Sequence, residues 1–366
     1  MIGLLSLCIW IYLAFAHGRF WASAPQLPPS APTEFPAVDI IVPARDEAGT
    51  IVPVIASLRA QDYAGKFRIL LVDDNSTDGT ADLAGTAPNL QTIDAQAKPP
   101  GWSGKLWALR QGIAASDAPL LLFTDADIVH DPRHLTSLVA GLEARGVGML
   151  SEMVSLNCMS LAERALVPAF VYFFQMLYPF AKVNDAHSSV AAAAGGTILI
   201  RRELLQRCGG MEAIKSALID DVALAAIVKK SASLYLGHSV LAASVRPYPQ
   251  FSDMWRMISR TAFTQLRYST VLLAVTLVGL ALMWLAPVWE MLFGHGWGFY
   301  CGLGACILAA LTYLPTLARY GRSKLWALCL PLIALFFMAA TIGSALESWF
   351  GMGTRWKSRA YESSHP

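Results

Sequence analysis

The chain has 366 residues, of which 55% are hydrophobic and 15% are charged, and its formal net charge is +2. An ordinary soluble domain is roughly one quarter charged, so this composition, with a mean hydropathy of +0.46, indicates that part of the chain lies in a bilayer. The mild charge excludes the strongly basic surface of a nucleic-acid-binding protein. Its six cysteines show neither metal-site nor disulfide spacing.

The first apolar segment, Ile2 to Ala16, is shorter than the ~20 residues that span a bilayer. Its end, Ala14-Phe15-Ala16, resembles the cleavage site of a secretory signal. However, no Lys or Arg precedes the segment and Arg19 follows it, which favours a retained anchor with its amino end outside. We therefore predict a membrane anchor over residues 1–22 and a stiff Pro-rich tether over residues 23–36.

Two strand–loop–helix units open the predicted catalytic domain, residues 37–250. The first has a strand at Val38 to Val42, a polar loop, and a helix whose apolar face begins at Ile51. The second has a strand at Phe67 to Val72 and then the loop Asp73 to Thr80, whose Asp, Asn, Ser and Gly residues favour turns and helix caps. Polar loops at strand carboxyl ends are where open α/β sheets bind ligands.

A third apolar strand, Leu120 to Thr124, ends in Asp125-Ala126-Asp127. Carboxylates placed there suit Mg²⁺ or Mn²⁺, because one or two of them hold the ion and leave positions that a diphosphate can fill. For a lone Asp-x-Asp, a solvated turn is the alternative. The two upstream loops favour the metal site, and we predict that all three loops share one crevice. His130 lies three residues further on and is a less favoured ligand.

Two later segments carry alternatives. Leu161 to Val183 is apolar and aromatic, and we predict an interfacial helix over residues 161–183 that guides a lipid acceptor. A buried helix that packs on the sheet would show the same pattern. Further on, Asp220-Asp221 precedes an apolar helix. Aspartate is favoured in the first turn of a helix, and the same carboxylates can also serve in catalysis.

The last third of the chain is predicted to enter the bilayer. An amphipathic juxtamembrane helix covers residues 251–268, and transmembrane helices cover residues 269–350. The second range contains three apolar stretches, Thr270 to Val288, Trp297 to Leu317 and Leu325 to Leu346, without Asp, Glu, Lys or Arg, which are costly in hydrocarbon. Three full spans would place the basic tail, residues 351–366, opposite to the catalytic domain and against the positive-inside rule. Either one segment is re-entrant or the tail breaks that rule.

Taken in order, these motifs resemble family 2 glycosyltransferases over about Pro36 to Tyr268. Within that family the chain is similar to membrane-bound hopene-associated, that is hopanoid-biosynthesis, glycosyltransferases. The segments that carry this similarity are Gly101-Trp102-Ser103-Gly104-Lys105-Leu106-Trp107-Ala108-Leu109 and Ser259-Arg260-Thr261-Ala262-Phe263. The resemblance implies an α/β fold, a GT-A-like nucleotide-binding mixed sheet flanked by helices, with transmembrane helices added.

It also implies an inverting, metal-dependent transfer of one sugar from a nucleotide-diphosphate sugar, with a UDP-sugar expected, to a hydroxyl of a membrane lipid. We expect Mg²⁺ or Mn²⁺ as cofactor, a hopanoid acceptor, and a multi-pass protein of the bacterial inner membrane whose catalytic domain is cytoplasmic. Sphingoid, carotenoid and polyprenyl-phosphate lipids are alternative acceptors. A processive polysaccharide synthase is less favoured, since Met257 to Thr261 lacks the Trp of the processive signature. An inactive scaffold is disfavoured by the intact aspartates.

The family motifs assign roles residue by residue. Asp221 is expected to be the general base, with Asp220 in support, and Arg260 is expected to hold the diphosphate. Asp127 is expected to bind the metal, and Asp125 to lie near the ribose or the metal. The remaining expected contacts to the nucleotide sugar are Pro43, Ala44, Arg45, Glu47, Asp74 and Lys105.

Overall fold

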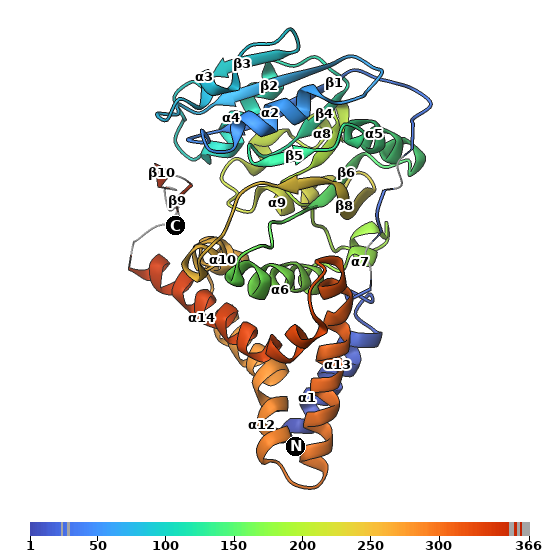
Figure 1. The fold of residues 1–366 in the computed structure, drawn as a ribbon, viewed down its shortest axis with the longest axis vertical. Helices are drawn as coiled ribbons and strands as arrows, with labels where there is room; N and C mark the ends of the chain where they lie inside the picture. The colour runs from blue at the N-terminus through green and yellow to red at the C-terminus, as the bar shows by residue number, and fades with distance from the viewer. Residues whose placement is uncertain (23–24, 28–29, 351–354, 357–358, 361–366) are drawn as a thin grey trace. The chain divides into compact units, whose positions relative to one another are not determined.

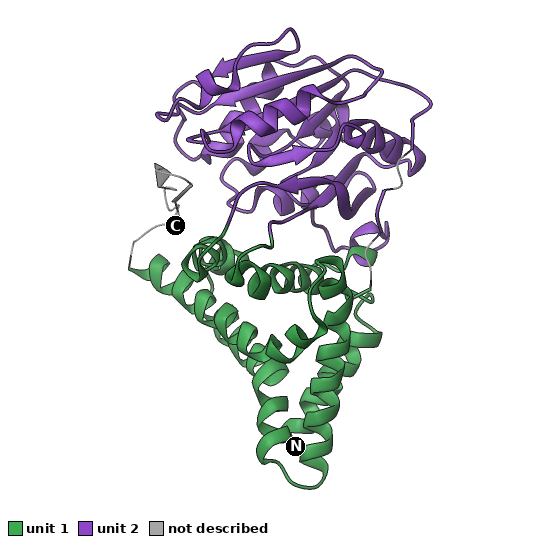
Figure 2. Cartoon of the chain, viewed as in Figure 1, with its two compact units in different colours: residues 1–24, 158–181, 248–354 green, residues 25–157, 182–247, 355–366 purple. Residues whose placement is uncertain are grey.

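The computed structural model describes residues 1–366 apart from 23–24, 28–29, 351–354, 357–358 and 361–366. The chain divides into two compact units (Figure 2). We call residues 25–157, 182–247 and 355–366 the sheet unit, and residues 1–24, 158–181 and 248–354 the helical unit. The chain passes repeatedly between them, so neither unit is a single continuous stretch of sequence.

Within the described residues, the sheet unit contains an eight-stranded sheet of order β3-β2-β1-β4-β7-β6-β8-β5 (Figure 1). Strands β3, β2, β1 and β4 are parallel, whereas β7 is antiparallel to both β4 and β6, and β5 is antiparallel to β8. The predicted mixed sheet is therefore confirmed. The strands are β1 Val38–Ala44, β2 Phe67–Asp73, β3 Leu90–Asp94, β4 Leu120–Phe123, β5 Ile128–His130, β6 Met149–Ser155, β7 Ile198–Arg201 and β8 Leu234–Ser244.

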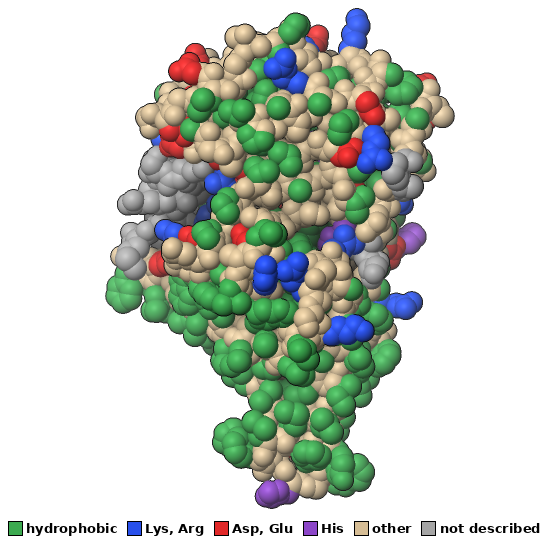
Figure 3. Space-filling model, viewed as in Figure 1, with side chains coloured by type: hydrophobic (Ala, Val, Ile, Leu, Met, Phe, Trp, Pro, Cys, Tyr) green, Lys and Arg blue, Asp and Glu red, His purple; other side chains and the backbone are tan. Residues whose placement is uncertain are grey.

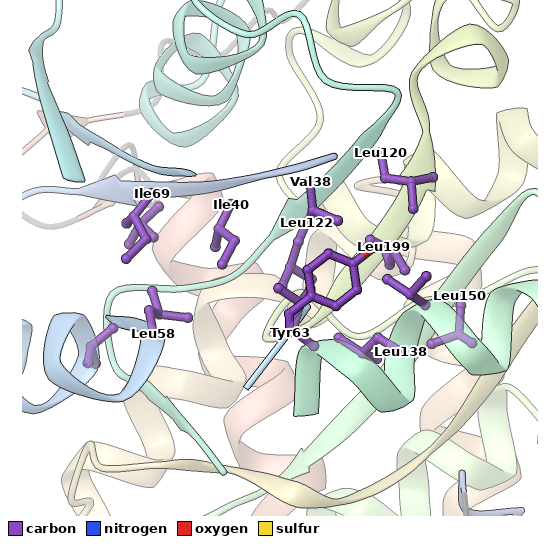
Figure 4. Close-up of a cluster of buried hydrophobic side chains, with 14 of the residues drawn as sticks. Val38, Ile40, Leu58, Tyr63, Ile69, Leu120, Leu122, Leu138, Leu150 and Leu199 are labelled. Carbon is purple, nitrogen blue, oxygen red and sulfur yellow. The ribbon is translucent and has the colours of Figure 1, made fainter. Parts of the chain in front are cut away.

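Apolar side chains from the sheet and from α2 and α5 fill one core, part of which Figure 4 shows. Residues Ile51, Val54, Ile55 and Leu58 recur on one face of α2 and are all buried. Burial of each such side chain contributes about 1.5–3 kcal/mol. The helices of the sheet unit are α2 Ile51–Arg59, α3 Thr80–Ala84, α4 Gly104–Ala114, α5 His134–Ala144, α8 Arg202–Arg207, η1 Met211–Ile214 and α9 Asp220–Val228, with α7 Phe180–Asn184 at the boundary between the units.

The Pro-rich segment predicted as a tether lies against the sheet unit where it is described. The carbonyl oxygen of Pro25 accepts a hydrogen bond of 3.1 Å from the amide of His238 in β8. Leu27 is buried in the main core, and the amide of Thr33 donates to Glu143 at 2.9 Å. These contacts make the described residues from Pro25 onward part of the sheet unit.

The helical unit contains, among the described residues, three helices long and apolar enough to cross a membrane, Thr270–Phe293, Trp297–Arg319 and Lys324–Trp349. Hydrophobic side chains dominate the visible face of this unit (Figure 3). Its elements are α1 Ile2–Phe15, α6 Leu161–Leu177, α10 Phe251–Gln265, α11 Thr270–Leu280, the π-helical turn η2 Ala281–Leu285, α12 Ala286–Phe293, α13 Trp297–Arg319, η3 Lys324–Cys329 and α14 Leu330–Trp349. The tail contains β9 Arg355–Trp356 and β10 Arg359–Ala360, and residues 357–358 and 361–366 lie outside the described part.

Helix α6 belongs to the helical unit, not to the catalytic domain in which the sequence placed it. It ends at Leu177, so the predicted single helix over 161–183 is divided into α6 and α7. The hydroxyl of Tyr172 lies 2.8 Å from Thr312 Oγ1 of α13, and the ring of Phe173 packs edge-on against Phe337 of α14. Helix α6 therefore packs on other helices of its own unit.

Substitutions at two glycines, one in α14 and one in α11 as a control, test how closely α14 packs on α10. A Cβ atom added at Gly343 of α14 would lie 2.6 Å from the ring of Trp255 of α10, whereas one added at Gly279 of α11 has nothing within 4 Å. We expect Gly343→Leu to destabilise the protein by about 1–3 kcal/mol through overpacking, and Gly279→Leu to be close to neutral. Thermal unfolding of both variants in the same detergent checks this. Equal midpoints would contradict the packing of α14 on α10.

Candidate functional site

The first two predicted loops hold each other in place at the carboxyl ends of β1 and β2. The Arg45 guanidinium donates to the carbonyl oxygen of Asp74, and its Nη1 lies 3.5 Å from the Asp74 carboxylate, which is fully buried. The amide of Glu47 donates to Thr80 Oγ1 at 2.8 Å, and the amide of Ala48 donates to Asp78 at 2.9 Å. The loops are thus fixed before any ligand binds, as a preformed site requires.

Lys105 brings together carboxylates from two distant parts of the sequence. Ser103 caps α4 by accepting a hydrogen bond from the amide of Leu106, so Lys105 lies in the first turn of the helix. Its Nζ lies 2.9 Å from Asp125 Oδ1 and 3.1 Å from Asp220 Oδ2. Lys105 is therefore held among carboxylates and is not a solvated surface lysine. The lysine instead balances charge among carboxylates that would otherwise repel one another.

Asp221 is held by two backbone amides. Gly195 donates to its Oδ2 at 2.9 Å, and Val222 donates to its Oδ1 at 2.8 Å. A Cβ atom at Gly195 would lie 3.2 Å from Lys105 Nζ and 3.5 Å from Asp221 Oδ2, so a glycine here leaves room for the backbone beside the charged groups. The sequence analysis missed Gly195, because the run Ala191 to Gly196 carries no chemical side chain that would mark it.

The pKa values of Asp221, Asp125 and Lys105 in this cluster are all shifted from their ordinary values. Burial, together with the nearby charge of Asp220, raises the pKa of Asp221 to about 7, although Lys105 and the two amides oppose the shift. Burial raises the pKa of Asp125 as well, with Lys105 opposing. Burial alone would lower the pKa of Lys105, but attraction to Asp125 and Asp220 outweighs it and raises that pKa well above its usual value. A carboxyl that titrates near neutrality can take up and release a proton at physiological pH.

Arg246, which the sequence analysis also missed, joins the third loop to the first. Its Nε donates to Asp127 Oδ2 at 2.5 Å, and its Nη2 donates to Glu47 Oε1 and Oε2 at 2.8 and 2.6 Å. Burial opposes the charge of Arg246, but Asp127 and Glu47 outweigh it and raise its pKa further above the usual range. The only signal in the sequence is a cationic residue just beyond the long strand β8.

His130 does not approach Asp127 as a ligand. It is buried, its Nε2 lies 3.0 Å from Thr124 Oγ1, and its Nδ1 lies 2.7 Å from Nδ1 of His134. The Nε2 of His134 lies 2.8 Å from the buried carboxylate of Glu152. This buried chain of polar groups contacts Thr124, which lies between the end of β4 and Asp125. Burial and the neighbouring His134 keep the pKa of His130 well below its usual value.

An open hollow is lined by Lys105, Asp125, Asp220 and Asp221. Its apolar wall includes Leu106, Leu109, Phe123, Ile198, Met211, Ile214 and Leu224, and its polar wall includes Lys105, Thr124, Asp125, Asp220 and Asp221, with Pro43 and Gly195 completing the lining. Ala44 is not among the lining residues; its carbonyl oxygen accepts a hydrogen bond of 2.8 Å from the amide of Asp74 and so links the first two loops. Arg260, another predicted site residue, belongs to α10 of the helical unit and is not among the residues that line the hollow.

The oxygen ligands suit a divalent cation that shares its coordination with phosphate. Among the described residues, no group of three or more His, Cys, Asp or Glu side chains is gathered so as to hold a metal alone. Asp125 and Asp127 stand one residue apart at the end of β4, with side chains 35% and 15% exposed. Mg²⁺ typically takes one or two carboxylates and completes its coordination with substrate phosphates and water. This carboxylate pair fits that requirement.

Comparison with known proteins identifies the family. Residues 39–209 of the chain match the family described as "Glycosyl transferase family 2". An N-acetylglucosaminyltransferase of Azorhizobium caulinodans is 32% identical over 129 residues, which are 33% of this chain and 32% of that protein. An N-acetylglucosaminyltransferase of Bradyrhizobium elkanii is 32% identical over 127 residues, 33% of this chain and 69% of that protein. The match thus spans about a third of the first relative's length.

The solved structure of a mannosyltransferase from Pyrobaculum calidifontis, in complex with GDP-Man and Mn²⁺, is similar with a TM-score of 0.54. It is 21% identical, and the alignment covers 97% of this chain and 100% of that chain. At this identity the similarity shows the fold, a GT-A-like mixed sheet flanked by helices. The predicted fold class is therefore confirmed. By its sequence match and its fold, the chain belongs to glycosyl transferase family 2.

Proposed function

We propose that this protein transfers one sugar, with inversion, from a nucleotide-diphosphate sugar to a hydroxyl of a membrane lipid. The observation that carries the proposal is that Lys105, Asp125, Asp220 and Asp221 line one hollow. The positive charge of the lysine thus lies beside Asp125, a proposed metal ligand, and close to Asp221, the proposed base. Such a cluster supplies both needs of the reaction, charge balance for a diphosphate and a proton acceptor.

The donor would bind at the carboxyl ends of β1, β2 and β4. In this proposal Pro43, Ala44, Arg45, Glu47 and Asp74 hold the base and ribose of a UDP-sugar, through loops that are already fixed by the Arg45–Asp74 and Glu47–Thr80 contacts. Lys105 would lie near the diphosphate. It is in the first turn of α4, where the helix dipole also favours a negatively charged group.

Asp127, with Asp125, would hold Mg²⁺ or Mn²⁺ against the donor diphosphate. A cation bound there supplies Lewis-acid stabilisation of the leaving nucleoside diphosphate. In the structure Arg246 neutralises Asp127 and Glu47, so binding of the cation and the diphosphate would free the guanidinium to turn toward phosphate oxygens. Arg246 is thereby a further proposed contact to the donor.

Asp221 is the proposed base. It would accept the proton of the acceptor hydroxyl as the oxygen attacks the anomeric carbon, while the bond from that carbon to the diphosphate oxygen breaks on the opposite face. The amides of Gly195 and Val222 fix the orientation of the carboxylate. Asp220 stays paired with Lys105 and supports the charge balance. Arg260 is proposed to hold diphosphate from α10.

A lipid acceptor is supported by the helical unit, whose long apolar helices suit a bilayer. The resemblance to hopanoid-biosynthesis enzymes favours a hopanoid in the bacterial inner membrane, with the sheet unit on the cytoplasmic side, where nucleotide sugars are made. A sphingoid, carotenoid or polyprenyl-phosphate acceptor would use the same site chemistry. Polymer synthesis is disfavoured, because Met257 to Thr261 lacks the aromatic residue of the processive signature.

The pH dependence follows from Asp221. Only the ionised carboxylate accepts a proton, so kcat/KM should fall about tenfold for each pH unit below an apparent pKa of about 7. Lys105→Met removes a nearby positive charge that favours ionisation, and should move this limb to higher pH. Measuring kcat/KM from about pH 5 to about pH 9 checks both expectations. A profile that is level through this range would contradict the assignment of Asp221.

The donor and acceptor classes are tested by incubating membranes that contain the protein with a panel of radiolabelled nucleotide sugars, followed by lipid extraction and mass analysis. We expect label from one nucleotide sugar in the lipid fraction, only when a divalent cation is present. Label that stays in water-soluble products with every donor would count against a lipid acceptor.

A further inference from the structure

The helices of the helical unit have a definite direction, which three contacts establish. The amide of Gly3 in α1 donates to Glu290 Oε1 of α12 at 3.3 Å, and Ser6 Oγ donates to the carbonyl oxygen of Leu282 at 2.8 Å. The start of α1 therefore lies beside the end of α12 and the short loop 294–296. A Cβ atom at Gly302 of α13 would lie 2.7 Å from the carbonyl oxygen of Pro287, so α13 runs back along α12.

These directions define two ends of the unit. One end holds the start of α1 and the loop 294–296. The other end holds Thr270, where α11 begins, and Arg319, where α13 finishes. A third crossing by α14 would have to begin near Arg319 and finish near the loop 294–296.

The contacts of α14 show the opposite course. In the first half of α14, Phe337 packs against Phe173, whose ring also packs against Trp284, in the middle of the segment Thr270–Phe293. Near its end, Ala345 packs with Leu273, one turn from the start of α11. As the chain proceeds along α14, it therefore returns to the end where α11 begins and α13 finishes.

The element η3 leads the chain from the end of α13 to the start of α14. It packs along α13, and its six residues, Lys324–Cys329, advance by ~12 Å at ~2 Å per residue. This distance is less than half of a hydrocarbon core of ~30 Å. Helix α14 then rises obliquely toward α10, as Figure 1 shows.

Helix α10 fixes the depth of the returning half. The Ser344 hydroxyl donates to the carbonyl oxygen of Ser259 and accepts from the amide of Phe263 at 3.0 Å, and the Trp349 ring packs edge-on against the Phe263 ring. The same α10 exposes Arg256 and Arg260, which would cost at least ~2.5 kcal/mol each at the bilayer centre. An amphipathic helix of this kind lies in the interface, so the half of α14 packed along it lies there as well.

We propose that η3 and α14 form a re-entrant segment that enters one leaflet and leaves on the side it entered. After the sheet unit the chain then crosses the bilayer twice, through α11 to α12 and through α13. The surface of the re-entrant segment is an interface with the acyl chains of that leaflet, since it exposes the large apolar side chains of Leu325, Leu328, Leu332, Leu335, Ile342 and Leu346.

The charges of the chain agree with this course. Arg319, Arg322 and Lys324 flank the end of α13, and Arg355, Lys357 and Arg359 follow α14. With two crossings, both basic clusters lie on the same side, as the positive-inside rule requires. Three crossings would separate them. The inference is independent of the proposed function.

Epitope tags placed in the full-length chain test the inference directly. One tag is inserted in the loop 294–296, one in the loop 320–323, and one after Pro366, and each is exposed to protease in right-side-out and in inverted membrane vesicles. We expect the tags at 320–323 and after Pro366 to be cleaved in the same vesicles, and the tag at 294–296 in the other kind. Cleavage of the terminal tag together with the tag at 294–296 would overturn the proposal.

Disulfide cross-linking tests the direction of α14 without tags. In a chain whose six native cysteines are replaced, Leu273→Cys with Ala345→Cys should form a disulfide in native membranes on mild oxidation, because these side chains pack together. The matched pair, Leu292→Cys with Ala345→Cys, should not, since Leu292 lies at the far end of α12. A disulfide in the second pair in place of the first would show that α14 crosses the bilayer.

Discussion

Asp221→Asn is expected to reduce turnover with acceptor by ~10²–10⁴-fold while leaving donor affinity nearly unchanged. Asparagine preserves the size of the side chain and can still accept one of the two amides, Gly195 or Val222, but a neutral amide cannot take the acceptor proton. The expected loss corresponds to about 3–5.5 kcal/mol in the barrier of the chemical step, at ~1.4 kcal/mol per decade. Single-turnover transfer and donor binding, measured on the same preparation, check the result.

Asp220→Asn is the matched control, because Asp220 precedes Asp221 in the first turn of α9. It loses the ion pair with Lys105 but keeps the proposed base, so its effect on turnover should be milder. If Asp220→Asn proved the more damaging to turnover at equal donor affinity, the roles within the pair would be reversed. If neither substitution changed turnover, the base would lie elsewhere.

Asp127→Ala is expected to abolish the dependence of donor affinity on Mg²⁺ or Mn²⁺ while the protein still folds. A cation that bridges carboxylate and diphosphate supplies several kcal/mol, so affinity at saturating metal should fall ~10²-fold or more. Folding should survive because Arg246 keeps both of its bonds to Glu47. Titration of the donor with and without metal, followed by calorimetry, measures the effect.

Asp117→Ala is the control for that substitution. Its side chain is 94% exposed and pairs with Arg68 at the surface of the same unit, where an ion pair is worth at most about 1 kcal/mol. Donor affinity and its response to metal should match the wild type. An Asp127→Ala protein whose affinity still rose on addition of Mn²⁺ would contradict the metal assignment.

The strands and the three loops could be predicted from the sequence, because local pattern determines them. Buried parallel strands such as Val38–Ala44 appear as short apolar runs, and each is followed by a polar loop at the same edge of the sheet. The order of strands places those edges together, so the three loops could be expected in one crevice, whereas the roles of Lys105 and Asp221 came from the family resemblance.

Other features depend on the fold alone. Gly195 reaches Asp221 through its backbone, and Arg246, just beyond β8, is distant in sequence from Asp127 and Glu47, so no local spacing reveals either contact. For α6, apolarity indicated burial but not the partner, which proved to be other apolar helices. Length and hydropathy likewise marked α14 as a span, whereas its course depends on packing against α10 and α11.

The product formed by the purified enzyme from its nucleotide sugar and a membrane lipid extract tests the central claim most directly. We predict that mass analysis of the lipid fraction shows one added sugar residue, formed only with a divalent cation and lost in Asp221→Asn. A ladder of lipids with successive sugars, or full product formation by Asp221→Asn, would contradict single transfer by this site.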